Sequence, residues 1–164
     1  MKKIFLMMCF CIFVLLFSSC RIQNYGILSY QEKKIDAECT LNGEYKISIA
    51  KRGELREISF LEPSTLSHIS FKINDESIVA RAGETEIPLE SENVRGILAL
   101  SSVFSLSESC LATAGILDER SNMEFQTEYG TYTLTLGKNN LPSRVQIYSE
   151  YYRYDVSIDA IMLS

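Results

Sequence analysis

The sequence lacks the residues and motifs on which the common enzyme classes depend. His68 is the single histidine, and one histidine cannot supply the three or four ligands of a zinc site. No HExxH, GxSxG, P-loop or GxGxxG pattern occurs, which leaves the chain without the signatures of zinc proteases, serine hydrolases and nucleotide-binding folds. We therefore expect a protein that is not an enzyme and that holds no metal and no cofactor. An envelope hydrolase is the least favoured function.

The sequence also lacks an apolar run long enough for a spanning helix, which needs about 20 residues. The longest run, Ile4 to Phe17, has fourteen uncharged residues. Lys2 and Lys3 precede this run, and small residues and Cys20 follow it. A short positive segment, an apolar segment and small residues are the layout of a secretory signal peptide. The pattern predicts an exported protein.

The end of this segment, Leu16-Phe17-Ser18-Ser19-Cys20, resembles the lipobox of bacterial lipoproteins. Phe17 stands where the lipobox usually has leucine. The resemblance implies that residues 1–19 are a lipoprotein signal peptide and that Cys20 carries a diacylglycerol thioether, with acyl chains such as palmitate. Residues 20–29 are then a tether, and the domain is anchored on the extracytoplasmic face of the cell membrane. The alternative is an ordinary signal peptide followed by an incidental cysteine.

An excess of basic residues is absent as well. Without Lys2 and Lys3 the chain has fourteen basic and twenty-one acidic residues, a net charge of −7. Nucleic-acid binding depends on clustered lysine and arginine, and anionic lipid surfaces attract the same residues. The charge argues against a nucleic-acid partner, and leaves the acyl anchor as the contact with the membrane. The 145 residues from Cys20 onward are enough for one domain with a real core.

Two cysteines, Cys39 and Cys110, remain after the signal peptide and Cys20 are set aside. An even remainder in an exported protein permits one disulfide. The other reading is two separate thiols that act as small apolar side chains. We favour the thiols, because the two cysteines fall in different kinds of element and nothing in the sequence fixes their distance.

Most of the chain has the period-two alternation of antiparallel β-strands. Residues 35–41 alternate apolar and polar side chains, and Asn42-Gly43 then gives the strongest short hairpin signal. Similar patterns predict about six strands before residue 90 and four more after residue 121, about ten in all. Residues 91–104 show helical spacing, with Ser91 as the N-cap. Gly96 would let this helix approach a sheet closely. We read 107–115 as a second short helical piece.

Two stretches follow the repeating pattern of the LolA-like lipoprotein carriers: "YKISIAKRGELREISFLEPSTLSHISFKI" and "YTLTLGKNNLPSRVQIYSEYYRYDVSI". That superfamily includes small clostridial lipoproteins such as the germination lipoprotein GerS. The resemblance implies a mainly β (α+β) fold over residues 30–164. It would be a strongly curved antiparallel half-barrel with one main helix on its concave side. In carriers of this family the concave side holds acyl chains, whereas the germination lipoprotein engages a protein partner.

Two functions remain open, because an apolar pattern fits both a groove and a filled core. The first is a tethered protein that binds a lipid or another apolar ligand between sheet and helix; its candidate groove residues are Ile47, Phe60, Phe71, Val94, Ile97, Leu98 and Phe104. The second is an envelope or spore lipoprotein with a filled core that meets a protein partner through Tyr151 and Arg153. A cavity of a few hundred Å³ distinguishes the first function from the second.

Overall fold

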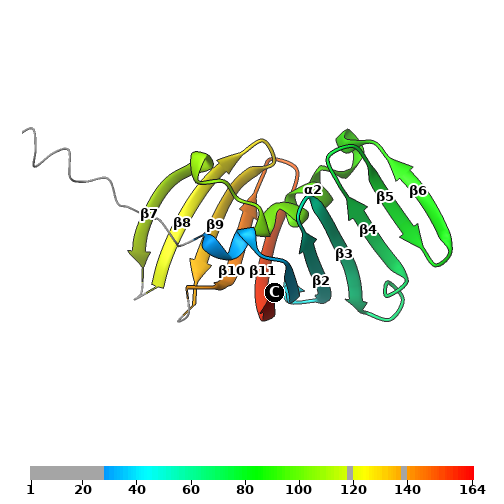
Figure 1. Cartoon of the computed structure of the whole chain (residues 1–164), viewed down its shortest axis with the longest axis horizontal. Coiled ribbons are helices and arrows are strands. Elements are labelled where there is room, and N and C mark those ends of the chain that lie inside the picture. Colours follow the sequence, from blue (N-terminus) through cyan, green and yellow to red (C-terminus); the bar gives the residue numbers. More distant parts are fainter. Residues whose placement is uncertain (1–27, 118–119, 138–139) are drawn as a thin grey trace, which may run out of the picture.

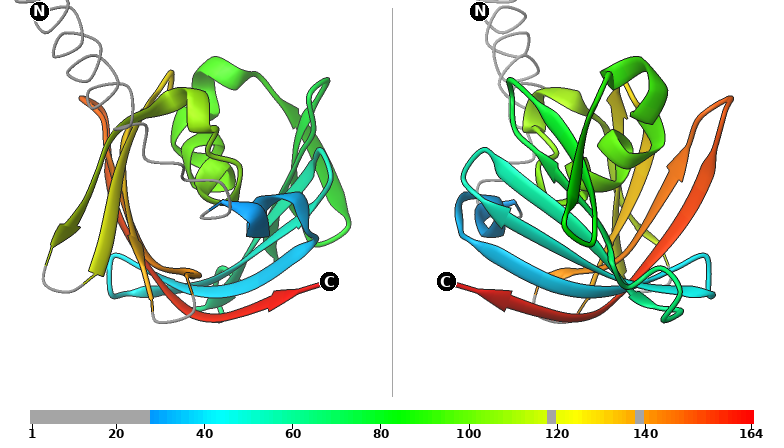
Figure 2. Two further views of the ribbon diagram at one scale, coloured as in Figure 1. Left: turned by 60° about the vertical axis from the view of Figure 1, so that its left-hand side comes forward. Right: turned by 90° about the vertical axis from the view of Figure 1, so that its right-hand side faces the viewer.

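Eleven β-strands form a single curved antiparallel sheet in the computed structural model, which describes residues 28–117, 120–137 and 140–164. The sheet bends into an open half-barrel, and the short helices lie on its concave side (Figure 1, Figure 2). The predicted fold class is therefore confirmed. The signal peptide and Cys20 lie outside the described residues. Within the described ranges, no helix has the length and apolar character to cross a membrane.

The elements follow the chain in two runs of strands separated by helical turns. The first run comprises η1 (Ser29–Glu32), β1 (Ile35–Leu41), β2 (Tyr45–Arg52), β3 (Leu55–Glu62), β4 (Ile69–Ile73), β5 (Ile78–Ala82) and β6 (Thr85–Leu89). The helical segment comprises η2 (Ser91–Val94), α2 (Arg95–Ser101), η3 (Ser102–Phe104) and η4 (Glu108–Cys110). The second run comprises β7 (Leu111–Leu117), β8 (Arg120–Thr127), β9 (Gly130–Leu136), β10 (Pro142–Tyr148) and β11 (Arg153–Leu163).

The two runs are joined at the centre of the sheet, where the first strand pairs with the last. The strand order is β6-β5-β4-β3-β2-β1-β11-β10-β9-β8-β7, so β1 and β11 are the only neighbours that are not consecutive in the described chain. Ile35 pairs with Leu163 and Leu41 with Val156. Strands β6 and β7 are the two free edges. The half-barrel stays open because these edges do not meet.

The alternation seen in the sequence puts apolar side chains on the concave face. In β1, Ile35, Ala37, Cys39 and Leu41 are buried, and the intervening residues are not. Asn42 and Gly43 have φ angles of 53° and 73°. These positive values form a tight turn in which the Glu44 N–H donates to the Leu41 carbonyl oxygen at 3.1 Å, and Leu41 pairs with Tyr45 across the three-residue loop. The predicted β1–β2 hairpin is confirmed.

The helical segment is shorter and less regular than the sequence pattern predicted. A 3-10 turn comes first, α2 has only seven residues, and a second 3-10 turn ends the segment. The prediction of Ser91 as N-cap is wrong, since Glu90 holds that position and makes no side-chain cap bond. At the other end the Ser101 and Ser102 hydroxyls both donate to the Leu98 carbonyl oxygen at 2.8 Å. Such bonds tighten and end a helix.

One buried and one half-buried polar side chain fix this segment over the sheet. The Tyr132 hydroxyl, from β9, donates to the Ala99 carbonyl oxygen at 3.0 Å, and burial raises the pKa of this hydroxyl. The Lys51 ammonium, from β2, donates to the Phe104 carbonyl oxygen at 3.1 Å and also to Gln31 in η1. Burial lowers the pKa of Lys51, and the nearby Arg56 lowers it further. One bond comes from each half of the sheet, so the helix is held across its centre.

The predicted second helical piece is wrong for most of its length. Residues 108–110 form one 3-10 turn, and residues 111–117 are strand β7, which pairs with β8 at the sheet edge. The pattern of this stretch was ambiguous, and the ladder offered by β8 satisfies its backbone groups better than an isolated helical turn would.

Both cysteines are free thiols in the structure. Cys39 is buried on the concave face of β1, and Cys110 is half-buried at the end of η4. Burial raises the pKa of the Cys39 thiol to about 12, and the nearby carboxylates of Asp159 and Glu38 act in the same direction. Cys39 is therefore an inert apolar side chain rather than a reactive group.

Gly96 lies directly against Tyr154 of β11. A Cβ atom at Gly96 would overlap the Tyr154 hydroxyl and would stand 3.4 Å from the ring carbon Cζ. The ring has little freedom to move, because Tyr154 stacks on Tyr152 with 5.2 Å between the ring centroids. The glycine therefore allows the close approach of helix to sheet that its position in the sequence suggested.

The contact between Gly96 and Tyr154 predicts that Gly96→Ala changes the free energy of unfolding in opposite directions in the parent protein and in Tyr154→Phe. Gly96→Ala should lower the free energy of unfolding by about 1–2 kcal/mol, because the new methyl group overlaps a constrained hydroxyl. In a Tyr154→Phe background the overlap is gone, and the same substitution should raise stability by up to about 1 kcal/mol through helix propensity. Urea unfolding of the four proteins measures both effects. Equal effects in the two backgrounds would contradict the proposed contact.

Candidate functional site

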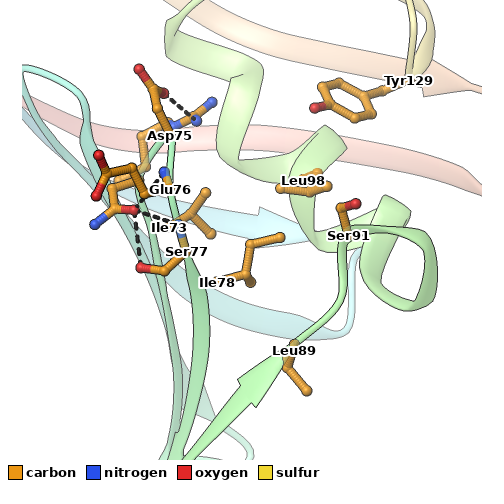
Figure 3. Close-up of a pocket in the computed structure, with 11 residues that line it drawn as sticks. Ile73, Asp75, Glu76, Ser77, Ile78, Leu89, Ser91, Leu98 and Tyr129 are labelled. Atoms are coloured by element: carbon orange, nitrogen blue, oxygen red, sulfur yellow. Dashed lines mark hydrogen bonds and ion pairs between the residues drawn. The ribbon is translucent and has the colours of Figure 1, made fainter.

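A cleft of about 520 Å³ opens between the first half of the sheet and the helical segment. Its walls are the β4–β5 turn, the end of β6, the face of α2 that carries Leu98, and Tyr129 from the β8–β9 turn. Figure 3 shows Asp75, Glu76 and Tyr129 at one end of the cleft and Leu89 at the other, with Ile78 and Leu98 between them. The volume lies in the range of small-molecule sites, roughly 300–1,000 Å³.

The floor of the cleft is one row of residues that runs across neighbouring strands. Arg56 of β3 pairs with Ile73 of β4, Ile73 with Ile78 of β5, and Ile78 with Leu89 of β6. Leu98 of α2 faces this row from the other side. Paired residues point to the same face of a sheet. The row therefore has a charged group at one end and three apolar side chains leading from it toward the edge strand, of which Ile73 and Ile78 are buried and Leu89 is half-buried.

The charged end of the cleft holds a cation that has few partners. The Arg56 side chain is only 19% exposed, and its ion pair with Asp75 is long, at 3.9 Å. Asp75 is 68% exposed. Among the described residues, the Arg56 guanidinium makes no hydrogen bond in addition to this ion pair. The positive charge is thus fixed and partly desolvated, whereas its carboxylate partner lies in solvent at the rim.

The β4–β5 turn, which forms one wall, is held by the Asn74 side chain and by a backbone hydrogen bond from the Asn74 N–H to the Ser77 carbonyl oxygen at 3.0 Å. The Asn74 Oδ1 atom accepts hydrogen bonds from the backbone N–H groups of Glu76 and Ser77 at 3.0 and 2.7 Å, and from the Ser77 hydroxyl at 3.0 Å. Asparagine commonly closes turns in this way. The turn sets the position of Asp75 relative to Arg56.

Tyr129 closes the opposite side of the cleft. Its backbone N–H donates to the Thr127 hydroxyl at 3.1 Å, and its carbonyl oxygen accepts from the Tyr152 hydroxyl at 2.6 Å. Burial raises the pKa of the Tyr129 hydroxyl; neighbouring Glu128 acts in the same direction and Arg56 against it. At pH 7 the side chain is a neutral phenol. It also lines a smaller hollow of about 210 Å³ beside Tyr151.

The predicted groove residues occupy three different environments. Ile47 and Phe104 are fully buried, so they fill the core and line neither described hollow. Phe60, Phe71, Val94 and Ile97 are half-buried and pack against the core. Only Leu98 lines the larger cleft. Ile47 and Phe104 thus belong to the filled core, and the larger of the two hollows lined by described residues lies to one side of them.

The predicted partner residues are exposed, as expected. Tyr151 precedes β11 and is 73% exposed, and Arg153 is exposed at the first position of that strand. Tyr152 and Tyr154 turn inward and pack against the core. Among the described residues, no group of three His, Cys, Asp or Glu side chains is placed to hold a metal ion.

Sequence reasoning missed Arg56, Ile73, Ile78, Leu89 and Tyr129. A signal for part of the row was available: a two-residue turn at Gly83-Glu84 places Ile78 opposite Leu89. Arg56 and Tyr129 come from strands and turns far apart in the chain. No local pattern brings them to one cleft.

Comparison with known proteins finds structural similarity at low sequence identity. No family model matches the chain, and no curated protein matches its sequence. A solved structure of an uncharacterized conserved protein from Thermus thermophilus aligns with a TM-score of 0.48 and 15% identity, over 84% of this chain and 85% of that one.

Two further solved structures align at 9% identity. A LolA superfamily protein from Nitrosomonas europaea gives a TM-score of 0.43 over 85% of this chain and 93% of its own. A domain described as an outer membrane lipoprotein-sorting protein, from Vibrio parahaemolyticus, gives 0.47 over 84% and 91%. These values do not carry a ligand or a residue's role across to this protein.

The Asn74 contacts predict a local change in the cleft wall. Asn74→Ala removes one acceptor from three donors and should lower the free energy of unfolding by about 1 kcal/mol. Amide exchange at Glu76 and Ser77 should become faster than in the parent protein. Asn74→Asp keeps an acceptor oxygen at this place and serves as the control. Unchanged exchange rates in Asn74→Ala would show that the turn does not depend on this side chain.

Proposed function

We propose that the protein is a membrane-tethered binding protein, not an enzyme, that holds a single-chain amphipathic molecule in the cleft between β3–β6 and α2. The observation that carries the proposal is the segregated lining of the cleft. Three apolar residues of the cross-strand row and Leu98 form one part, and Arg56, Asp75, Glu76 and Tyr129 form the other. A ligand with an apolar tail and a polar head matches both parts.

The size of the cleft favours a single chain over a large lipid. Neighbouring strands lie about 4.8 Å apart, so the three steps from Arg56 to Leu89 cover roughly 14 Å. An extended chain of ten to twelve carbons is about 11–14 Å long, since C–C bonds near 1.5 Å alternate in direction and each advances the chain by about 1.25 Å. The filled core beneath the helix leaves no room for the tail to turn inward, because Phe104 and Ile47 are fully buried there. The tail therefore runs along the sheet toward β6.

In the same proposal Cys20 carries the membrane anchor. Burial of acyl chains contributes about 0.8 kcal/mol per CH₂, and two chains give stable attachment. The described domain begins at residue 28, and the eight residues from Cys20 to residue 28 span at most about 28 Å. This length keeps the cleft within reach of lipids that leave or enter the bilayer surface.

A second candidate function is protein recognition through the exposed aromatic end of the β10–β11 hairpin. Tyr151 is the most exposed of the large apolar and aromatic side chains in the described residues, and Arg153 lies two residues on. Tyrosine and arginine are enriched in interface hot spots. This function does not require the cleft, so loss of ligand binding would leave it intact.

The cleft predicts that a bulky side chain at its mouth blocks binding. Residues 21–164 with Ser91→Trp should bind the neutral amphiphile monodecanoylglycerol at least about tenfold more weakly than the parent, because the indole fills space beside Leu98. Ser157→Trp, on an exposed position of β11, adds the same side chain away from the cleft and should leave affinity unchanged. Isothermal titration measures both. Equal affinities would contradict binding in this cleft.

Anchoring makes a separate prediction. The full chain, expressed in a bacterium fed an alkyne analogue of palmitate, should incorporate the label and sediment with membranes. Cys20→Ser should abolish the labelling and move the protein to the soluble or secreted fraction. Cys110→Ser, a control at a half-buried thiol, should do neither. Labelling that persists in Cys20→Ser would rule out lipidation at this cysteine.

A further inference from the structure

We propose that the ligand of this cleft carries an anionic head group, a carboxylate or a phosphate, and that Arg56 recognises it. The inference rests on the proposed function, because it assigns the head-group chemistry of the same site. The cleft could in principle take a neutral, a cationic or an anionic amphiphile. The arrangement of charges around Arg56 distinguishes the three.

The first argument is the state of the Arg56 guanidinium. The Arg56 side chain is 19% exposed and lines the cleft, yet its ion-pair partner among the described residues, Asp75, stands 3.9 Å away and is exposed. A guanidinium offers five N–H donors in a planar fork that matches carboxylate and phosphate oxygens. A partly desolvated cation with donors to spare gains more from an anion in the cleft than a fully solvated one would.

The second argument is the neighbourhood of Arg56 in the sheet. Lys51 lies opposite Arg56 in the β2–β3 register, and the charge of Arg56 contributes to the lowered pKa of Lys51. The two cations thus stand side by side at the end of the row. An incoming anion reduces the repulsion between them. A cationic head group at this place would add a third positive charge.

The third argument is the contrast between the fixed cation and the exposed acids. Asp75 is 68% exposed and Glu76 is exposed, so both carboxylates are hydrated and screened at the rim. Asp75 is tied to the turn through its backbone, whereas its side chain is free to leave Arg56. An anionic head group therefore replaces Asp75 as the partner of Arg56, with the neutral Tyr129 phenol facing the same space.

The polarity of the row then orients the ligand. With the head at Arg56, the tail passes over Ile73 and Ile78 and ends near Leu89, the last residue of the edge strand β6. The helix side chain Leu98 covers the tail from above. The opposite orientation would place a charged head against Leu89 and an apolar tail against Arg56. The charged head and the guanidinium would then both lose water without gaining a polar partner.

The test uses probes that share one ten-carbon tail, with a photoreactive diazirine and an alkyne near its end, and differ in the head group. The heads are carboxylate, phosphate, neutral alcohol and primary ammonium. The full chain in lipid nanodiscs is labelled at increasing probe concentration, and the concentration for half-maximal labelling is measured. Peptide mass spectrometry maps the labelled residues, which should fall within 73–89.

We expect the carboxylate or phosphate probe to label the protein at lower concentration than the alcohol, and the ammonium probe to be the weakest. The anionic head with the lower half-maximal concentration identifies the natural class. Arg56→Gln should raise that concentration roughly 10- to 100-fold, the effect of losing a charged hydrogen-bond partner, and should change the alcohol value much less, because a neutral head gains less from a guanidinium. A urea-unfolding midpoint close to that of the parent shows that the variant is folded. The half-maximal concentration for Arg56→Lys should lie between those of the parent and Arg56→Gln.

Asp75→Asn distinguishes a ligand with an anionic head group from one with a cationic head group. Removing the competing carboxylate should improve labelling by the anionic probe. Stronger labelling by the ammonium probe that is lost in Asp75→Asn would overturn the inference in favour of a cationic ligand. Equal labelling by all heads would overturn the inference and leave the proposed function standing. No labelling by any probe would overturn both.

Discussion

The architecture depends on one mismatch of size: a wide apolar face has only a short helical segment to cover it. Eleven strands about 4.8 Å apart give a sheet roughly 48 Å wide, whereas a seven-residue helix is about 10 Å long. The helical segment covers the centre, where Phe104 and Val103 are fully buried. On the first half of the sheet, α2 lies against β3 and β4. The cleft is a part of the concave face beside the helix, bounded by β4–β6 and by Leu98, that the helical segment does not fill.

The position of the cleft follows from the contacts that hold the helix. Tyr132 binds the Ala99 carbonyl from the second half of the sheet, and Lys51 binds the Phe104 carbonyl from the first. Gly96 lets α2 rest on Tyr154 of β11. These three contacts lie near the β1–β11 seam, which itself joins the two runs of strands. A helix held at the seam leaves the side facing β6 open, so the site is a consequence of how the core is closed.

Local patterns predicted the elements well where one signal decided the outcome. Asn42-Gly43 fixed a hairpin, because few other conformations accept two consecutive positive φ angles. Residues 111–117 were misread, because their strand is formed by pairing with β8 rather than by local preference. Ile47 and Leu98 looked alike in the sequence, yet the first fills the core and the second lines the cleft. That difference depends on where the helix ends, and no single stretch encodes it.

The stability of the fold does not explain why an arginine stands at position 56. Its position in the cross-strand row suits an apolar side chain, since its neighbour Ile73 and the next residue Ile78 are buried. A partly buried ion pair contributes little stability, because desolvation offsets the attraction between the charges. The long, single contact with Asp75 does not compensate for this cost. The ligand that we propose gives this charge a role, because a cation at the end of an apolar row would select an anionic head and set the direction of the tail.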